Sequence, residues 1–115
     1  MIYLNKVRVL IWPEQEQYAA ECLELSTIVV NSTKEEAATR TTKLIDELFS
    51  HVIRKRVPLE KLLHPSSQQV QDDYLRAENF PFTTTEYLTP DVRAVVKEIE
   101  YRFYSGTTPD GALLK

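Results

Sequence analysis

Hydrophobic side chains follow a period of two along most of the first 31 residues. Apolar residues alternate with their neighbours over 2–12, which predicts a strand with one buried face. A polar break at 13–17 contains a proline, and the alternation resumes over 18–23. A short β-branched run follows at 27–30. The pattern therefore predicts three strands, of which the first two form a hairpin.

The hydrophobic period changes to three and four residues after these strands. Ser32 and Thr33 each stand three residues before a glutamate, which is the spacing of a hydroxyl cap at a helix start. The helix should begin near Lys34 and end before Pro58. Its buried stripe is formed by Ala37, Thr41, Leu44, Leu48 and Val52, and it is widened by Ala38, Ile45, Phe49 and Ile53. This broad apolar face should lie across the three strands.

Patterns in the second half of the chain are weaker. Residues 58–64 lie between two prolines and predict one or two turns of helix. Residues 66–73 contain one apolar residue, and they form either a loop or the exposed face of a helix that continues to Arg76. The segment 82–88 combines aromatic residues with threonines, so we expect a fourth strand there.

A second helix is predicted after this strand. Thr89, Pro90 and Asp91 combine a capping hydroxyl, a first-turn proline and an acid at the positive end of the helix dipole. The helical spacing then continues through Val92, Val95, Val96, Ile99 and Phe103. We expect an amphipathic helix over 90–104 that ends at Gly106.

Together these elements indicate an α+β fold. Residues 1–57 would form a three-stranded antiparallel sheet packed on a long helix, in the order β-β-β-α. Residues 58–106 would extend this unit by a short helix, a strand and an amphipathic helix, packed on it or on a partner. Residues 107–115 should form a mobile tail. A chain of 115 residues can bury one hydrophobic core and is too short for two full domains.

Charge differs between the two halves. Residues 1–57 hold 8 basic and 8 acidic side chains, and residues 58–115 hold 6 and 9, which gives the whole chain a net charge of −3. The only dense basic run, 54–56, falls in the last turn of the long helix, where cations complement free carbonyls. The expected strand 82–88 has no Lys or Arg with which to read bases. We therefore do not expect direct nucleic-acid binding.

The sequence also limits the compartment. No stretch approaches the length of a membrane span, and the start lacks a basic region followed by an apolar one. A single cysteine, Cys22, excludes the disulfide-rich secreted class. We expect a cytoplasmic protein that does not contact membranes.

Residues suited to catalysis are few. A metal nuclease needs several carboxylates that converge on divalent ions, and residues 1–13 contain no acid. Cys22 shares a strand face with Tyr18 and Ala20, as a core cysteine does, and neither His51 nor His64 stands in a motif with it. These three residues also lack the spacing of a zinc site. We expect no enzyme activity, no metal and no cofactor.

Two segments of the first half match the pattern of a known family. They are residues 17–25, QYAAECLEL, and residues 33–37, TKEEA. The first is similar to a strand of the HicB antitoxin family and the turn after it, and the second is similar to the turn into that family's long helix. The resemblance covers about residues 3–56. Its departures fall at turns, where Leu23 replaces a proline, Ser26-Thr27 replace Pro-Gly, and Asn31-Ser32 replace Gly-Asp. These loops must therefore use other backbone conformations.

The resemblance implies a degraded RNase H-like β-β-β-α-β unit that binds proteins. Members of the family dimerise and cover a small ribonuclease toxin, while a separate C-terminal element binds operator DNA. For this chain the resemblance implies a small basic, toxin-like partner, held through a strand edge or the acidic second half. The usual DNA-binding element is missing from residues 58–115.

Two candidate surfaces follow from this interpretation. Glu21, Glu24, Glu86 and Tyr87 are the candidate partner-binding residues. The candidate homodimer interface is formed by Val92, Val95, Val96, Ile99 and Phe103, an apolar stripe that a small sheet would leave partly uncovered. The alternative hypothesis is a self-associating structural or regulatory homo-oligomer, completed by helix 90–104 and strand 82–88.

Overall fold

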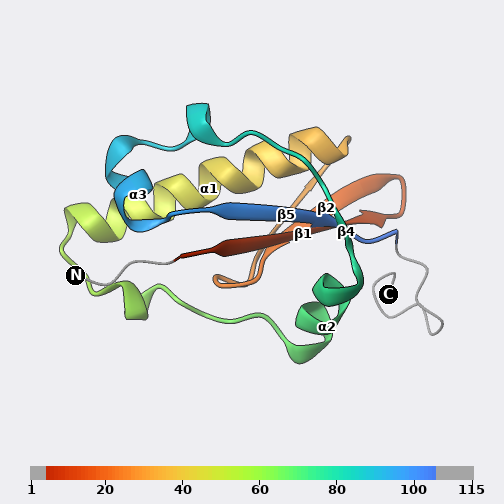
Figure 1. The fold of residues 1–115 in the computed structure, drawn as a ribbon, viewed down its shortest axis with the longest axis horizontal. Helices are drawn as coiled ribbons and strands as arrows, with labels where there is room; N and C mark the ends of the chain where they lie inside the picture. The colour runs from red at the N-terminus through yellow and green to blue at the C-terminus, as the bar shows by residue number, and fades with distance from the viewer. Residues whose placement is uncertain (1–4, 106–115) are drawn as a thin grey trace.

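A five-stranded sheet with helices on both faces forms the centre of the molecule (Figure 1). The computed structural model describes residues 5–105, and the strand order is β3-β2-β1-β5-β4. The strands are β1 Val7–Glu14, β2 Gln17–Cys22, β3 Thr27–Asn31, β4 Glu78–Asn79 and β5 Ile99–Phe103. The helices are α1 Lys34–Arg54, α2 Gln68–Arg76 and α3 Pro90–Val95, with 3-10 turns η1 Leu59–Lys61 and η2 Thr85–Tyr87. The expected α+β class is confirmed.

The strand β1 lies in the middle of the sheet. It pairs antiparallel with β2, which itself pairs antiparallel with β3, so the predicted three-stranded antiparallel sheet is confirmed. A two-residue turn joins β1 to β2, with Gln15 at φ 57° in place of the usual glycine or asparagine. On its other side β1 pairs parallel with β5, which ends where Phe103 opposes Ile11. Pro13, which has no N–H to donate, lies beyond that point.

The long helix α1 covers one face of the sheet. It begins after Thr33, whose hydroxyl accepts the backbone N–H of Glu36 at 3.0 Å, as the capping pattern predicts. Its buried side includes Ile45 and Phe49, packed against the alternate residues of β1 and β2. The hydroxyl of Tyr101 in β5 is hydrogen-bonded to Thr42 across this layer. We call this side of the sheet the α1 face.

The shorter helix α2 covers the opposite side, which we call the α2 face. Of the two alternatives for residues 66–76, the helix is correct, and Ser67 caps it by accepting the N–H of Val70. Its buried apolar cluster is small and consists of Leu10, Trp12, Ala19, Leu23 and Tyr74. The two faces of the sheet are therefore covered very differently.

The expected strand at 82–88 is wrong. This segment runs over α1 as irregular chain and the turn η2 (Figure 1). Its aromatic residues pack on one another and on β5: the ring centroid of Phe82 lies 5.0 Å from that of Tyr101 and 6.0 Å from that of Tyr87. The aromatic content, which suggested a strand, instead serves to bury side chains over the core. The actual fourth strand, β4, is two residues long.

The expected helix over 90–104 is correct only in its first turns. Helix α3 ends at Val95, and Ile99–Phe103 forms the strand β5 instead. Ile99 and Tyr101 are buried with Glu100 between them, which is the period of a strand. As a parallel neighbour, β5 hydrogen-bonds to backbone groups of the central strand β1 that would otherwise be buried without partners. This requirement overrides the helical spacing of residues 99–103. The proposed tail 107–115 lies outside the described residues.

Candidate functional site

Two of the four candidate partner-binding residues are already engaged within the chain. Glu21 is 6% exposed and accepts a hydrogen bond from the hydroxyl of Ser66. Glu24 accepts from the backbone N–H and the Nε of Arg8, both at 2.7 Å. These carboxylates hold the connection before α2 and the start of β1. The buried Glu21 is not open to a partner, so its assignment is wrong, whereas that of the half-buried Glu24 stays a prediction.

The other two candidate residues lie on the opposite side of the sheet. Glu86 is exposed in η2, and Tyr87 is half-buried with its ring stacked on Phe82. Glu21 and Glu24 bond to groups on the α2 face, whereas η2 packs with α1. The sheet separates the two pairs, so the structure does not join the four residues in one surface.

The candidate dimer interface belongs to the core of the chain itself. Four of its five residues are buried against α1 and the sheet: Val92, Val95, Val96 and Ile99. The fifth, Phe103, is partly buried, and its ring centroid lies 6.2 Å from that of Tyr18. Because α3 and β5 complete this fold, the assignment of these residues to a homodimer interface is wrong.

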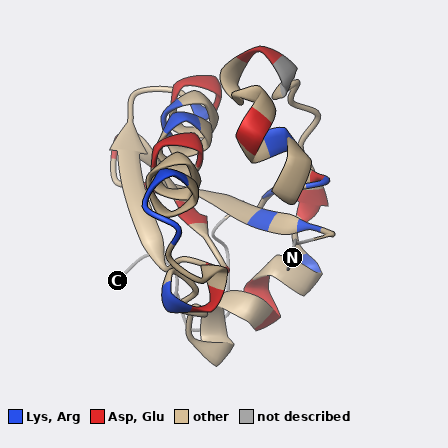
Figure 2. Cartoon of the chain, turned by 90° about the vertical axis from the view of Figure 1, so that its left-hand side faces the viewer, with Lys and Arg blue, Asp and Glu red and all other residues tan. Residues whose placement is uncertain are grey.

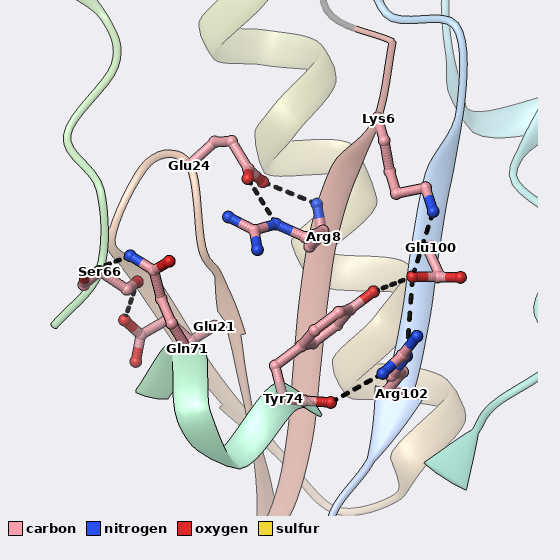
Figure 3. Close-up of polar contacts among 9 residues, drawn as sticks. All are labelled: Lys6, Arg8, Glu21, Glu24, Ser66, Gln71, Tyr74, Glu100 and Arg102. Carbon is pink, nitrogen blue, oxygen red and sulfur yellow. Dashed lines mark hydrogen bonds and ion pairs between the residues drawn. The ribbon is translucent and has the colours of Figure 1, made fainter. Parts of the chain in front are cut away.

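A network of charged and aromatic groups holds α2 to the sheet (Figure 3). The hydroxyl of Tyr74 donates to Glu100, and Arg102 donates to the carbonyl of Tyr74 at 3.0 Å. The guanidinium of Arg102 also lies 4.5 Å from the centre of the Tyr74 ring. Lys6 and Arg102 each approach the same Glu100 oxygen at 3.6 Å. Nearly every charge in this network has a partner, which is typical of a structural contact.

Titration in this network follows from its contacts. The hydrogen bond from Tyr74, helped by Lys6 and Arg102, lowers the pKa of Glu100 below its usual value, against the opposing effect of burial. Burial, followed by the hydrogen bond to Glu100, raises the pKa of Tyr74, which keeps the phenol protonated as a donor. In this network the carboxylate of Glu100 therefore accepts the hydrogen bond that the phenol of Tyr74 donates.

Cys22 does not have the setting of a nucleophile. It is fully buried beside Ala20 on the α1 face, as expected of a core cysteine. Burial raises the pKa of its thiol to about 12, so the thiolate is scarcely populated at neutral pH. His51 and His64 are exposed, and no group of three metal-ligating side chains occurs among residues 5–105.

An apolar groove of about 500 Å³ opens where α1 ends beside α3. Its walls are formed by Val52, Ile53, Val57, Pro58, Leu59, Ala94 and Val95. Three charged residues border it: Arg56, Glu60 and Asp91. Within the described part of the chain, neither Glu60 nor Asp91 forms an ion pair or a side-chain hydrogen bond. Figure 2 looks onto this end of the molecule, which carries both basic and acidic segments.

The shape of the groove depends on how α1 ends. Arg56 adopts a left-handed conformation at φ 56°, its N–H donates to the carbonyl of Ile53, and the N–H of Val57 donates to that of Val52 at 2.9 Å. This is a Schellman closure, in which glycine is usual because it has no Cβ. The closure turns the chain back, so that Val57 and Leu59 form one wall of the groove.

Sequence reasoning missed the groove and the polar network for different reasons. An apolar run after a helix end, Val57-Pro58-Leu59, was the available signal for the groove, but its other wall comes from α3, more than thirty residues later. The network joins β1, α2 and β5, and no local pattern indicates that these three meet.

Comparisons with known proteins identify no relative. No family model matches the chain, and neither the curated proteins nor the solved structures include a match. Among the described residues, no helix is long and apolar enough to cross a membrane.

Proposed function

We propose that this chain is a non-catalytic protein-binding module of HicB antitoxin type that sequesters a small basic partner. The observation that carries the proposal is the apolar groove between α1 and α3, bordered by the two unpaired carboxylates of Glu60 and Asp91. The β-β-β-α order of the first half, to which β5 is added later in the chain as a parallel neighbour of β1, also supports it, since the resemblance implies a β-β-β-α-β unit.

The groove suits a protein segment that carries an apolar side chain flanked by Lys or Arg. Its walls would bury the apolar side chain, and the carboxylates at its border would attract the flanking cations. Arg56 is the one cation in the lining, so the lining has a net charge of −1, in the same direction as the −3 of the whole chain. The proposal places the protein in the cytoplasm.

The test is co-expression of the tagged chain with the short basic protein encoded next to it, followed by titration calorimetry of the purified pair. We expect a stable complex, and growth rescue if the partner is toxic. Ala94→Arg places a cation in the groove, and Glu60→Lys reverses a charge at its border. We expect each to weaken binding at least about tenfold, which corresponds to the loss of one well-buried contact.

Glu16→Lys is the matched control, because it makes the same charge change at an exposed turn between β1 and β2. It should alter affinity less than about twofold. Binding that is unaffected by both groove substitutions would exclude the groove as the site. Absence of any complex with the neighbouring basic protein would reject the antitoxin-type function.

A further inference from the structure

One edge of the sheet is open and apolar. The strand β3 is outermost in the order β3-β2-β1-β5-β4, and no strand of the described residues pairs with its outer side. Ile28 and Val30 are 57% and 47% exposed, and they are two of the few large apolar side chains on the surface. They lie on the α2 face, beyond the area that α2 covers.

The edge lacks the features that usually prevent strand pairing. Residues 27–31 contain no charged residue and no proline, and their register with β2 runs through five successive pairs without a bulge. The opposite edge differs, because β4 is only two residues long and one of them is the charged Glu78. Of the two edges of the sheet in residues 5–105, the β3 edge is therefore the better suited to accept another strand.

The unpaired backbone N–H and C=O groups of β3 belong to Ile28 and Val30, the two residues whose side chains are exposed. The N–H of Leu23, just after β2, donates to the carbonyl of Arg8 in β1. Successive residues of a strand direct their backbone N–H and C=O groups to opposite sides, so Cys22 and Ala20 direct these groups toward β3. Thr27 and Val29, which oppose them in β3, direct their own backbone groups back toward β2. Ile28 and Val30 are left with outward-facing N–H and C=O groups.

We infer that β3 pairs with β3 of a second copy of this chain, antiparallel and with Val29 on the two-fold axis. In this register Ile28 of each copy opposes Val30 of the other, which places β-branched side chains in direct cross-strand contact. Thr27 opposes Asn31, and no like charges meet. The free groups of Ile28 and Val30 would hydrogen-bond across the junction and join the two sheets into one.

A second copy fits better than an unrelated strand because the edge is complementary to itself. The register is symmetric about Val29, apolar residues face apolar ones, and both α1 helices lie on the same face of the joined sheet. Two five-residue strands are small beside the roughly 1,600 Å² of a standard interface. We therefore expect dissociation constants in the micromolar range. This interface is independent of the proposed groove, which lies at the end of α1.

The first test is light scattering and sedimentation of the full chain from about 1 to about 500 µM. The average mass should rise from 13.3 kDa toward twice that value. Ile28→Lys with Val30→Lys places charges on exposed edge positions and should hold the chain monomeric at every concentration. Leu75→Lys, at a 72% exposed position of α2, is the control and should dimerise like the original chain.

The second test measures the register in which the two β3 strands pair. In the proposed dimer the two Val29 Cα atoms lie about 4.5 Å apart, within the roughly 4.4–6.8 Å that a disulfide spans. Val29→Cys should form a disulfide-linked dimer on mild oxidation. Thr27→Cys should not, because its two copies would lie four residues apart, about 13 Å. A chain that is monomeric throughout, or a dimer that survives the double lysine substitution, would overturn the inference, and capture of another protein's strand by a monomeric chain would do the same.

Discussion

The two faces of the sheet are held by different kinds of contact. The α1 face is a continuous apolar core in which Phe49 and Ile45 are fully buried against the strands. The α2 face has a five-residue apolar cluster, and polar contacts from Tyr74, Ser66 and Arg102 supply the remaining attachment. Apolar burial is lost only when the core opens, whereas a short helix held by polar groups can open separately. We expect the α1 face to set global stability and α2 to be a unit that opens first.

The largest expected effect is that of a cavity in the α1 face. Phe49→Ala removes a fully buried ring from α1 and should lower the free energy of unfolding by about 3–5 kcal/mol. Urea denaturation, followed by circular dichroism, measures this as a fall in the midpoint. Leu75→Ala, at an exposed position of α2, is the control and should change stability by less than about 0.5 kcal/mol. A similar loss for both variants would contradict the assignment of global stability to the α1 face.

The α1 face is also the part that the sequence predicts best. Strand alternation, the Thr33 cap and the stripe from Ala37 to Val52 are local patterns, and local patterns indicate this layer directly. In the second half, the predictions for 82–88 and 99–103 are wrong, because tertiary contacts decide the structure there. Aromatic residues there bury themselves without forming a strand, and a helical spacing gives way to β5 because β1 needs a neighbour.

The candidate site could be predicted less well than the fold. Residue type suggested Glu21 and Glu24 for a partner, yet Ser66 and Arg8 engage them, and those contacts span 45 and 16 residues of sequence. A sequence pattern shows that a residue is acidic, but not which distant group faces it. The exposed edge of β3 was visible as a β-branched run, although its place at the edge of the sheet was not.

On the α2 face, the next largest effect should come from Ser66→Ala. This substitution leaves the buried carboxylate of Glu21 without its donor and should cost about 1–3 kcal/mol. Ser32→Ala, at an exposed serine before α1, should cost less than about 0.5 kcal/mol. Thermal and urea denaturation of the two variants give the comparison. Equal stabilities would mean that the Ser66 contact does not hold the α2 face.

A smaller and more local effect is expected for Tyr74→Phe. It removes the hydroxyl that donates to Glu100 and keeps the ring that lies beside Arg102, so the loss should be about 1 kcal/mol. Hydrogen exchange should show faster exchange of the α2 amides, while the amides of α1 near Phe49 remain unchanged. If both helices exchange faster by the same factor, α2 opens only with the whole molecule, and the distinction between the faces fails.

The smallest effect should appear as a dependence on pH. Because the pKa of Glu100 is lower in the folded chain than its usual value near 4.5, folding favours the ionised carboxylate. Its contribution is present above that value and is lost as the pH falls through the folded pKa. The stability difference between the original chain and Glu100→Gln should therefore shrink from about pH 7 to about pH 3, since a protonated glutamate resembles glutamine.

Urea midpoints of both chains across this range measure that difference. Glu98→Gln serves as the control for the loss of one negative charge, at an exposed position two residues earlier. If the difference between the original chain and Glu100→Gln stays constant with pH, Glu100 does not gain from its contacts on folding. The contact between Tyr74 and Glu100 would then not help to hold the α2 face, which would depend on its apolar cluster and on the contacts of Ser66 and Arg102.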